Sequence, residues 1–271
     1  GGTFTNALNG AEFNGIFYFV TGSGSELWQT DGTSAGTTLI KGGLTAATLM
    51  INVNGTLFIS TYGDLYKSDG TSAGTVVVKS GIMSGGAWQM NQMNGELYFM
   101  PSPISGHILW KSDGTAAGTV IVKDNSSAAY FGVLEMIVIG NTIYFNSKDA
   151  NGIELWKSDG TTAGTVVVKD INPGTGNSSP GGFVNLNGTL MFLASDGTTS
   201  PYVLWKSDGT AAGTVLVSDV VVYSSSLVVG GGNVYIATPA NPKGLWKSDG
   251  TTAGTVLVGP VNNGIDLDPS R

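Results

Sequence analysis

Residues 154–165 read ELWKSDGTTAGT, and this stretch recurs along the chain with few changes. Five further copies begin at Glu26, Asp64, Ile108, Val203 and Gly244. Successive copies start 38 to 49 residues apart. Such a period is typical of the four-stranded blades of a β-propeller, which take about 40–50 residues each. The repeat therefore predicts an all-β chain built from six equivalent units.

Each repeat divides into four strand-like runs, which the second repeat shows most clearly at residues 46–53, 56–60, 64–68 and 75–79. Asn54-Gly55 separates the first two runs and is a strong signal for a tight hairpin, since both turn positions need a positive φ. The same dipeptide recurs at Asn14, Asn94 and Asn187, and permuted forms are predicted at Gly140-Asn141 and Gly232-Asn233. No segment shows the 3.6-residue period of an amphipathic helix.

The patterning within the strands selects among repeat folds. Residues 97–99 (LYF), 166–168 (VVV) and 190–192 (LMF) are continuously apolar, which indicates sheets covered on both faces. We therefore predict a six-bladed β-propeller of four-stranded antiparallel blades. A β-solenoid is the alternative, although its coils usually take about 20–30 residues. The prediction is a single domain, 1–271, with a tail at 260–271 and repeats at about 1–41, 42–79, 80–123, 124–169, 170–218 and 219–259.

The composition excludes several classes of function. The chain has 42 glycines, no cysteine, one histidine and a net charge of −7, and only 11% of its residues are charged. Disulfides and zinc–cysteine sites are impossible without cysteine. Twelve cations in an acidic chain do not make a nucleic-acid footprint. No apolar run approaches the ~18 residues that a membrane span needs, and the start at Gly1 has no character of a secretion signal.

The motif ELWKSDGTxAGTxxVK resembles a family of bacterial secreted and surface proteins that carry ELWxxDGTxxGT repeats. The likeness covers nearly the whole chain in six copies. It implies export, a propeller-like fold and attachment to larger cell-surface proteins, and it implies no defined ligand. The second repeat departs with Tyr66 in place of Trp, and the first with Gln29 in place of Lys. Only the fourth repeat continues into the family's KDINPG segment, at residues 169–174.

Three positions of the motif have a functional and a structural interpretation. The aromatic could offer one glycan platform per blade, but a residue present in every blade is better explained by packing between blades. The aspartate could bind calcium, but it stands alone in a turn, where it usually caps backbone N–H groups. The lysine two residues before it is expected to form a surface ion pair with it. The aromatics are Trp28, Tyr66, Trp110, Trp156, Trp205 and Trp246, and the aspartates are Asp31, Asp69, Asp113, Asp159, Asp208 and Asp249.

Catalysis has little support in the sequence. His107 is the only histidine, it lies in the long loop PSPISGH, and neither a GxSxG motif nor a second metal ligand accompanies it. Two loop carboxylates would have to converge for a glycosidase. We therefore expect no enzyme, no cofactor and no bound metal.

The loop lengths indicate where a ligand would bind. Turns between first and second strands are tight, and turns between third and fourth strands are always DGTxAGT, so both lie on one constant face. All length variation falls in the second-to-third and fourth-to-first connections on the other face, and binding residues concentrate in such loops. Trp88 is the one tryptophan outside the motif, although it could also belong to the core. The candidate ligand-binding residues are Tyr62, Trp88, His107, Tyr130, Asp149, Tyr202 and Tyr223.

Two functions remain after these exclusions. The first is an extracellular binding or adhesion module for a cell-surface glycan or protein. The second is a structural subunit of a surface filament or layer, assembled through exposed edge strands. Fourth strands end in lysine at Lys41, Lys79, Lys123 and Lys169, which opposes edge pairing, whereas the fifth and sixth repeats have Ser218 and Gly259. Self-association is therefore predicted to use blades 5 and 6.

Overall fold

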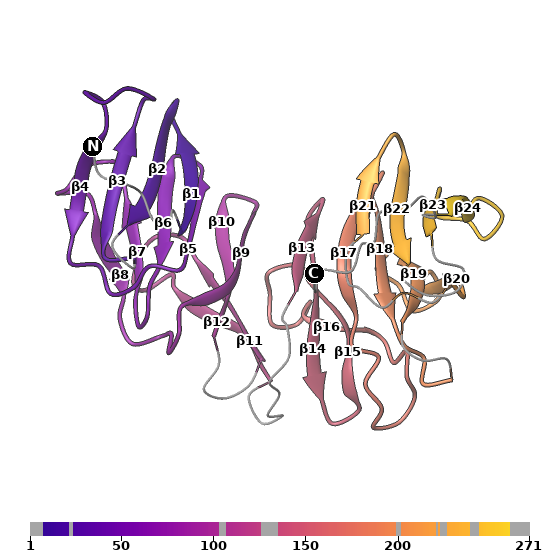
Figure 1. Cartoon of the computed structure of the whole chain (residues 1–271). Helices are drawn as coiled ribbons and strands as arrows, with labels where there is room; N and C mark the ends of the chain where they lie inside the picture. The colour runs from indigo at the N-terminus through magenta and orange to yellow at the C-terminus, as the bar shows by residue number, and fades with distance from the viewer. Residues whose placement is uncertain are drawn as a thin grey trace, which may run out of the picture. The chain divides into compact units, whose positions relative to one another are not determined.

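The computed structural model of the chain describes residues 8–21, 24–102, 107–125, 135–198, 202–220, 222, 227–238 and 244–260. This part of the chain contains twenty-four β-strands and no helix. The strands form six four-stranded antiparallel sheets, each from four strands consecutive in sequence, which we number sheet 1 to sheet 6 (Figure 1). The protein is a six-bladed β-propeller with these sheets as its blades, and it is not a solenoid.

The strand boundaries follow the repeats closely. Sheets 1 to 3 contain β1 (Leu8–Phe13), β2 (Ile16–Thr21), β3 (Glu26–Thr30), β4 (Thr38–Gly42), β5 (Leu49–Val53), β6 (Thr56–Ser60), β7 (Leu65–Ser68), β8 (Val76–Lys79), β9 (Ala87–Met93), β10 (Glu96–Pro101), β11 (His107–Ser112) and β12 (Val120–Asn125). Sheets 4 to 6 contain β13 (Met136–Ile139), β14 (Thr142–Asp149), β15 (Gly152–Ser158), β16 (Val166–Lys169), β17 (Gly181–Leu186), β18 (Thr189–Ala194), β19 (Val203–Ser207), β20 (Val215–Ser218), β21 (Leu227–Gly230), β22 (Asn233–Thr238), β23 (Gly244–Ser248) and β24 (Val256–Pro260).

The first hairpin of each sheet turns where the sequence predicts it, with one exception. Asn54 and Gly55 have φ of 48° and 83°, the left-handed conformation that an Asn-Gly turn requires. In sheet 6, however, the turn residues are Gly231 and Gly232, with φ of 55° and 74°. The prediction of a Gly232-Asn233 turn is therefore wrong by one residue, because Asn233 already pairs with Gly230 as the first residue of β22.

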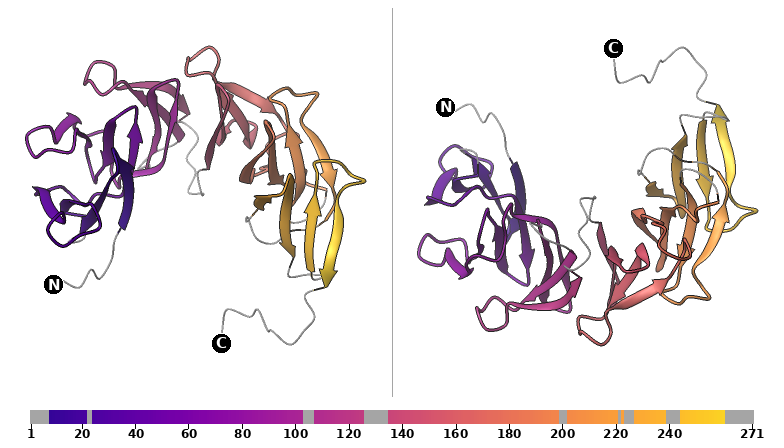
Figure 2. Two further views of the ribbon diagram at one scale, coloured as in Figure 1. Left: turned by 90° about the horizontal axis from the view of Figure 1, so that it is seen from above. Right: turned by 90° about the horizontal axis from the view of Figure 1, so that it is seen from below.

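The sheets fall into two compact units. The first comprises residues 1–134 with the turn 160–165, and the second comprises residues 135–159 and 166–271. Within each unit the sheets stand beside one another in chain order (Figure 2). In the first unit β1 contacts β5 and β5 contacts β9, while in the second β13 contacts β17 and β17 contacts β21. The first strands therefore lie at the edge where neighbouring sheets converge, and the fourth strands lie at the opposite, outer edge.

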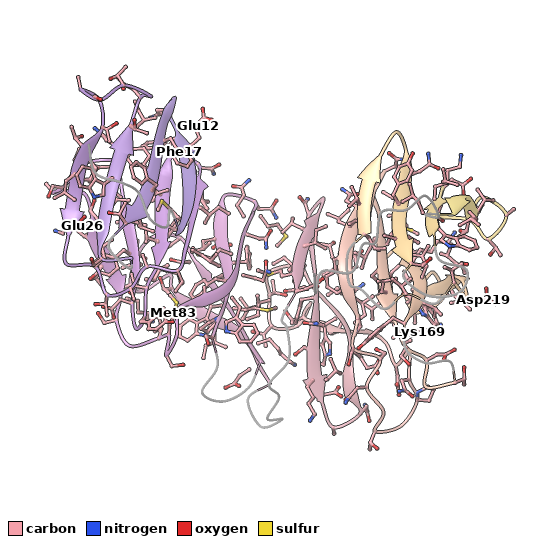
Figure 3. The ribbon with its side chains drawn as sticks, in the orientation of Figure 1. Glu12, Phe17, Glu26, Met83, Lys169 and Asp219 are labelled. Carbon is pink, nitrogen blue, oxygen red and sulfur yellow. The ribbon has the colours of Figure 1, made fainter. Side chains whose placement is uncertain are left out.

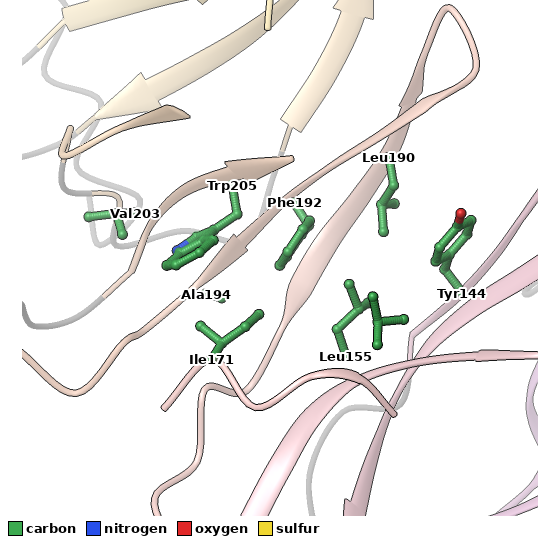
Figure 4. Close-up of a cluster of buried hydrophobic side chains, with 9 residues drawn as sticks. Tyr144, Leu155, Ile171, Leu190, Phe192, Ala194, Val203 and Trp205 are labelled. Carbon is green, nitrogen blue, oxygen red and sulfur yellow. The ribbon is translucent and has the colours of Figure 1, made fainter. Parts of the chain in front are cut away.

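Neighbouring sheets pack through one repeated arrangement of side chains. Tyr144 and Leu155 of sheet 4 point toward Leu190 and Phe192 of sheet 5, and Trp205 lies between Phe192 and Val203 (Figure 4). The same positions form the clusters between sheets 1 and 2, sheets 2 and 3, and sheets 5 and 6. Each cluster removes several large apolar side chains from water, which is the main stabilising contribution to such a junction.

The second strands are buried on both faces, as their continuous apolar runs predict. Residues 97–99 and 190–192 are all at most 2% exposed. The apolar run at residues 166–168 does not reflect burial on both faces of the sheet, because Val166 and Val167 of the outer strand β16 are exposed. The β15–β16 pairing skips Val168, so this residue is a β-bulge, and the same irregularity occurs between the third and fourth strands of all six sheets.

The bulge directs two consecutive residues of the outer strand at the following sheet. In sheet 2 the bulged Val78 packs with Leu97 and Phe99 of sheet 3. The next residue, Lys79, donates to the Thr119 carbonyl at 2.6 Å and lies 5.7 Å from the centre of the Trp110 ring. Lys169 (Figure 3) repeats this contact with the Thr214 carbonyl at 2.8 Å. These two lysines therefore join neighbouring sheets, besides adding charge to an edge.

The turn DGTxxGT is held by its own side chains. In sheet 3 the Asp113 carboxylate accepts hydrogen bonds from the Thr115 backbone N–H and hydroxyl, both at 2.8 Å. Asp31, Asp69, Asp208 and Asp249 make the same two bonds, so these aspartates cap their turns. These bonds to threonine are the main reason that the pKa of each of the five carboxyls is lowered.

A buried hydroxyl pair closes the same turn from the strand side. Thr119 Oγ1 donates to the Thr115 carbonyl at 2.7 Å, so its single proton is used there. Ser112 must therefore donate to Thr119 Oγ1 at 2.7 Å, while Ser112 Oγ accepts from the Gly114 N–H at 3.1 Å. Ser68–Thr75, Ser207–Thr214 and Ser248–Thr255 repeat this pair. The hydrogen bonds thus account for the serine and the last threonine of the repeat.

Gly118 is required by the cap, and this can be tested. A Cβ atom on Gly118 would overlap the Asp113 carboxylate, which would have to leave both of its bonds to Thr115. We expect Gly118→Ala and Asp113→Ala each to lower the free energy of unfolding by about 1–2 kcal/mol, the usual value of a cap. In an Asp113→Ala background, Gly118→Ala should cost almost nothing further. Additive losses in chemical denaturation would contradict this account.

Candidate functional site

The variable connections form a hydrogen-bonded layer at one end of the sheets. The connection from sheet 1 to sheet 2 is bonded to the second-to-third loops of both sheets, through Leu44 N to Ser25 O at 3.0 Å and Tyr62 N to Thr45 O at 2.8 Å. In the second unit, Ser195 N donates to Ser178 O and Val222 N donates to Tyr202 O, both at 2.9 Å. We call this end the loop face, and its described loops are fixed by their backbones.

Tyr62 is the most exposed aromatic side chain of the loop face among the described residues. It lies in the turn of residues 61–64 between β6 and β7 and is 53% exposed. Its own N–H binds the preceding connection, and the Gly63 carbonyl accepts from Ile82 at 2.9 Å in the following one. A rigid backbone thus presents an aromatic ring to solvent, which lowers the entropy cost of binding.

Trp88 lies at the start of β9, the first strand of sheet 3. The pairing of β9 with β10 skips Trp88, so it is the bulged residue, and its side chain is 39% exposed. Its neighbour Ala87 donates to Ser60 Oγ at 2.7 Å, and Ser60 in turn bonds Thr48 Oγ1 at 2.6 Å. Ser60 is two residues before Tyr62, and Ala87 is next to Trp88. The Ala87–Ser60 hydrogen bond therefore links the two segments that carry the aromatic residues.

We define the sheet 2–sheet 3 loop site as residues 61–64 and 80–88. It has one charged side chain, Asp64, whose carboxylate accepts from the Gly81 N–H at 3.1 Å. Its other polar groups are hydroxyls and backbone amides, including Ser84, which donates to the Ser102 carbonyl at 2.9 Å. This set of groups suits a neutral ligand that is rich in hydroxyls.

The other predicted site residues that the structure describes do not join this site. Asp149 ends β14 and accepts from Asn151 N at 2.7 Å, so the expected loop NSKDANG is a hairpin with a two-residue turn. Tyr202 is half-buried against the cluster between sheets 5 and 6. His107 begins β11, paired with Asn125, and does not lie in a loop. Tyr130 and Tyr223 lie outside the described residues, as does the His107 side chain.

Four of the six repeated aromatics lie between neighbouring sheets. Trp110, Trp205 and Trp246 pack on the cluster formed with the preceding sheet, and Tyr66 does the same. Trp156 is 5% exposed, and Trp28 donates to Glu26 at 3.0 Å. The motif aromatics therefore offer no row of open platforms in the described structure.

The prediction of an ion pair within each repeat is wrong. Lys67, Lys157 and Lys206 donate instead to the carbonyls of Gly114, Gly209 and Gly250, each in the following sheet, at 2.8 to 2.9 Å. Each lysine also helps to lower the pKa of that sheet's aspartate, after the hydrogen bonds from threonine. Lys111 differs, since it pairs with Glu96 at 3.2 Å. The side chains of Lys67, Lys157 and Lys206 therefore point toward the following sheet and away from the DGT turn of their own sheet.

Glu154 is a residue that the motif contained but the sequence analysis did not single out. It is 1% exposed and accepts from Ile171 N at 2.8 Å, Ser178 Oγ at 2.6 Å and Ser178 N at 3.2 Å. Burial raises the pKa of Glu154 to about 7, although these hydrogen bonds oppose the rise. Asp64 makes a similar bond in sheet 2, so an acid before the Leu-aromatic pair anchors the following connection.

Two kinds of feature are missing from the part of the chain that the structure describes. It holds no group of three or more histidine, aspartate or glutamate side chains that could bind a metal ion. None of its elements is a helix long and apolar enough to cross a bilayer.

Comparisons with known proteins support the fold. No family model and no curated protein matches the sequence. Among solved structures, the computationally designed Ika8 protein is 10% identical with a TM-score of 0.58, covering 93% of this chain and 73% of its own. A puromycin hydrolase mutant complexed with PGG is 13% identical with a TM-score of 0.55, and the match covers 93% of this chain and 44% of the hydrolase. At these identities the likeness is one of fold alone.

Proposed function

We propose that the protein is a non-catalytic binding module that takes a neutral carbohydrate at the sheet 2–sheet 3 loop site. The observation that carries this proposal is the exposed Tyr62 ring on a turn whose backbone is bonded to the connections on both sides. Trp88 adds a second exposed ring from the neighbouring first strand. Aromatic faces bind the apolar faces of sugars, and an ordered backbone avoids the entropy cost of fixing a loop.

The charge of the site supports a neutral ligand over an anion or a cation. Asp64 is its only charged side chain, and that carboxylate is already bonded to Gly81. The Ser84 hydroxyl of the site donates to the Ser102 carbonyl, and the Thr48 and Ser60 hydroxyls beside the site are bonded to each other. Selectivity would then come from the shape of the aromatic pair and from backbone groups at the rim.

We further propose that the module acts outside the cell, attached to the cell surface. The low proportion of charged residues and the resemblance of the repeats to those of bacterial surface proteins support this location. The absence of a histidine–nucleophile motif from the sequence supports binding without catalysis. A second function, as a subunit of a surface filament or layer, is favoured by the exposed valines of the outer strands, such as Val76, Val166 and Val256.

Binding to a glycan array tests the function. We expect the chain to retain a neutral oligosaccharide, with Tyr62→Ala and Trp88→Ala each weakening its affinity at least about tenfold, as loss of an aromatic anchor does. Leu39→Ala is the matched control, because Leu39 is 49% exposed in the same unit but lies on the outer strand β4.

The thermal melts of the variants decide how a loss of binding is interpreted. Both aromatic variants should melt within a few degrees of the parent chain, since both rings are exposed. Unchanged affinity in both variants, or retention of no glycan by the parent chain, would overturn the proposed site. If Trp88→Ala abolishes the cooperative melt, Trp88 belongs to the core, and only Tyr62 would remain as an anchor.

A further inference from the structure

Four of the six sheets join their first two strands through an Asn-Gly turn, and this dipeptide is chemically reactive. The glycine nitrogen can attack the side-chain carbonyl carbon of the asparagine, because glycine has no side chain to block the approach. The four asparagines have φ of 48° to 52°, so the turns share one backbone conformation. Differences in reactivity between them must therefore come from the contacts of each turn. The turns are Asn14-Gly15, Asn54-Gly55, Asn94-Gly95 and Asn187-Gly188.

In two of these turns a side chain of the preceding strand holds the glycine N–H. Gly188 N donates to Asn185 Oδ1 at 2.7 Å, and Gly55 N donates to Asn52 Oδ1 at 3.0 Å. Attack on the asparagine requires the glycine nitrogen to lose its proton, and this hydrogen bond retains the proton. The bond also opposes the local opening of the turn that ring closure needs. Asn54 and Asn187 are therefore protected.

The other two turns lack this bond. Gln92 and Glu12 stand where sheets 5 and 2 have Asn185 and Asn52, and each side chain is one methylene group longer than asparagine. The N–H groups of Gly95 and Gly15 donate to no residue that the structure describes. The protecting bonds lie within single hairpins, so this difference does not depend on how the sheets are arranged.

The Asp-Gly turns of the motif are held in the same way as the protected Asn-Gly turns. Gly70 N donates to Ser68 Oγ and Gly114 N donates to Ser112 Oγ, both at 3.1 Å. The glycines of three further motif turns make the same bond to a hydroxyl, and they are Gly32, Gly209 and Gly250. A side chain thus retains the proton of the reactive nitrogen in both kinds of turn. Gly15 and Gly95 depart from this rule.

We propose that Asn94 and Asn14 are sites of spontaneous modification through a succinimide. At the first site the Gly95 nitrogen gives its proton to a solvent base and forms a bond to Cγ of Asn94. The bond from Cγ to Nδ2 breaks, and this nitrogen takes a proton from solvent and leaves as ammonia. Water then opens the ring at Cγ, which gives aspartate, or at the main-chain carbonyl, which gives isoaspartate. Both products add a carboxylate, and isoaspartate also lengthens the backbone of the turn by a methylene group.

The modified turn of sheet 3 lies away from the loop site. Strand β9 begins at Ala87, beside Trp88, and ends at Met93, directly before Asn94. Asn94 is therefore at the opposite end of the strand from the proposed glycan site. Modification adds negative charge to a chain whose net charge is already −7, and it acts on the constant turns. It is thus independent of the proposed binding function.

Incubation of the folded chain in mildly alkaline buffer, followed by peptide mapping, tests the proposal. Chromatography separates the asparagine, aspartate and isoaspartate forms of each turn peptide. We expect conversion at Asn94 and Asn14 to be about three- to tenfold faster than at Asn54 and Asn187, the factor that one net hydrogen bond supplies.

A reciprocal exchange of side chains tests the cause. Gln92→Asn should slow conversion at Asn94 by that factor, and Asn185→Gln should speed conversion at Asn187 by the same factor. Both positions are exposed and each exchange alters a single methylene group, so the fold is retained. Equal melting temperatures of the variants and the parent chain verify this.

The unfolded chain provides the control. In concentrated guanidinium chloride the four turns should convert at similar rates, since the dipeptide is the same and no turn is held. A difference of equal size in the unfolded chain would assign it to the flanking sequence and overturn the proposal. Equal rates at the four turns of the folded chain would also overturn it, as would rates that neither exchange variant changes.

Discussion

Replacing Tyr144 with alanine should lower the free energy of unfolding by about 3–5 kcal/mol, the usual cost of truncating a large buried aromatic. Tyr144 is 6% exposed in the cluster between sheets 4 and 5, and its ring covers the Gly209 turn. Its removal would leave a cavity beside Leu155 and Phe192 that the rigid strands cannot fill. Urea denaturation followed by tryptophan fluorescence measures the loss.

Tyr62→Ala is the control for this result. Tyr62 is also a tyrosine but is 53% exposed in the turn between β6 and β7, so its truncation should cost under about 1 kcal/mol. Equal losses in the two variants would show that the ring of Tyr144 does not stabilise a junction between sheets.

Stability should fall as the pH rises from about 5 to about 8, because of Glu154. Burial raises the pKa of Glu154 to about 7 from 4.5, so the folded state binds its proton more tightly than the unfolded state. The stabilising effect of this proton is complete below pH 4.5 and is lost as the pH passes 7. A shift of this size corresponds to at most about 3 kcal/mol.

Glu154→Gln should flatten this pH dependence. The amide retains a carbonyl oxygen for the Ile171 N–H but carries no charge to desolvate. The capping aspartates have lowered pKa values, so their contribution is lost only at more acidic pH and does not overlap this window. Melting temperatures of the parent chain and the variant at pH 5 and pH 8 provide the measurement. An unchanged slope in the variant would assign the dependence to another group.

The connection after sheet 4 explains why the acid is retained there. Residues 169–174 are the one KDINPG segment of the chain, and Glu154 holds the loop that follows through Ile171 and Ser178. In sheets 5 and 6, Val203 and Gly244 stand at the position of Glu154. An acid at this position is thus a partner of the connection that follows its own sheet, as Asp64 also is in sheet 2.

The candidate site was only partly predictable. The sequence placed Tyr62 and Trp88 on the loop face, because tight turns alternate with variable loops in an up-and-down sheet. It could not show that Trp88 is the bulged residue of β9 or that Tyr202 is packed beneath the loops. Whether an aromatic at a strand end is exposed depends on the side chains of the next sheet, and these are distant in sequence.

The sequence alone determined the sheets and their turns. Asn54-Gly55 sets a hairpin, and the DGTxxGT turn is closed by hydrogen bonds among residues within eight positions of one another. Such local interactions recur wherever the motif recurs, because every group that they need is in the same segment. Six copies of the motif therefore predict six sheets of the same topology.

Only the tertiary structure decided what each sheet presents to its surroundings. Lys67 and Lys111 occupy the same position of the repeat, yet Lys67 donates to the Gly114 carbonyl of the next sheet whereas Lys111 pairs with Glu96 of its own sheet. Glu26 and Glu154 likewise share one position, but Glu26 accepts from Trp28 of its own strand and Glu154 accepts from Ile171 of the following connection. These contacts depend on residues that are distant in sequence, so similar repeats acquire different roles.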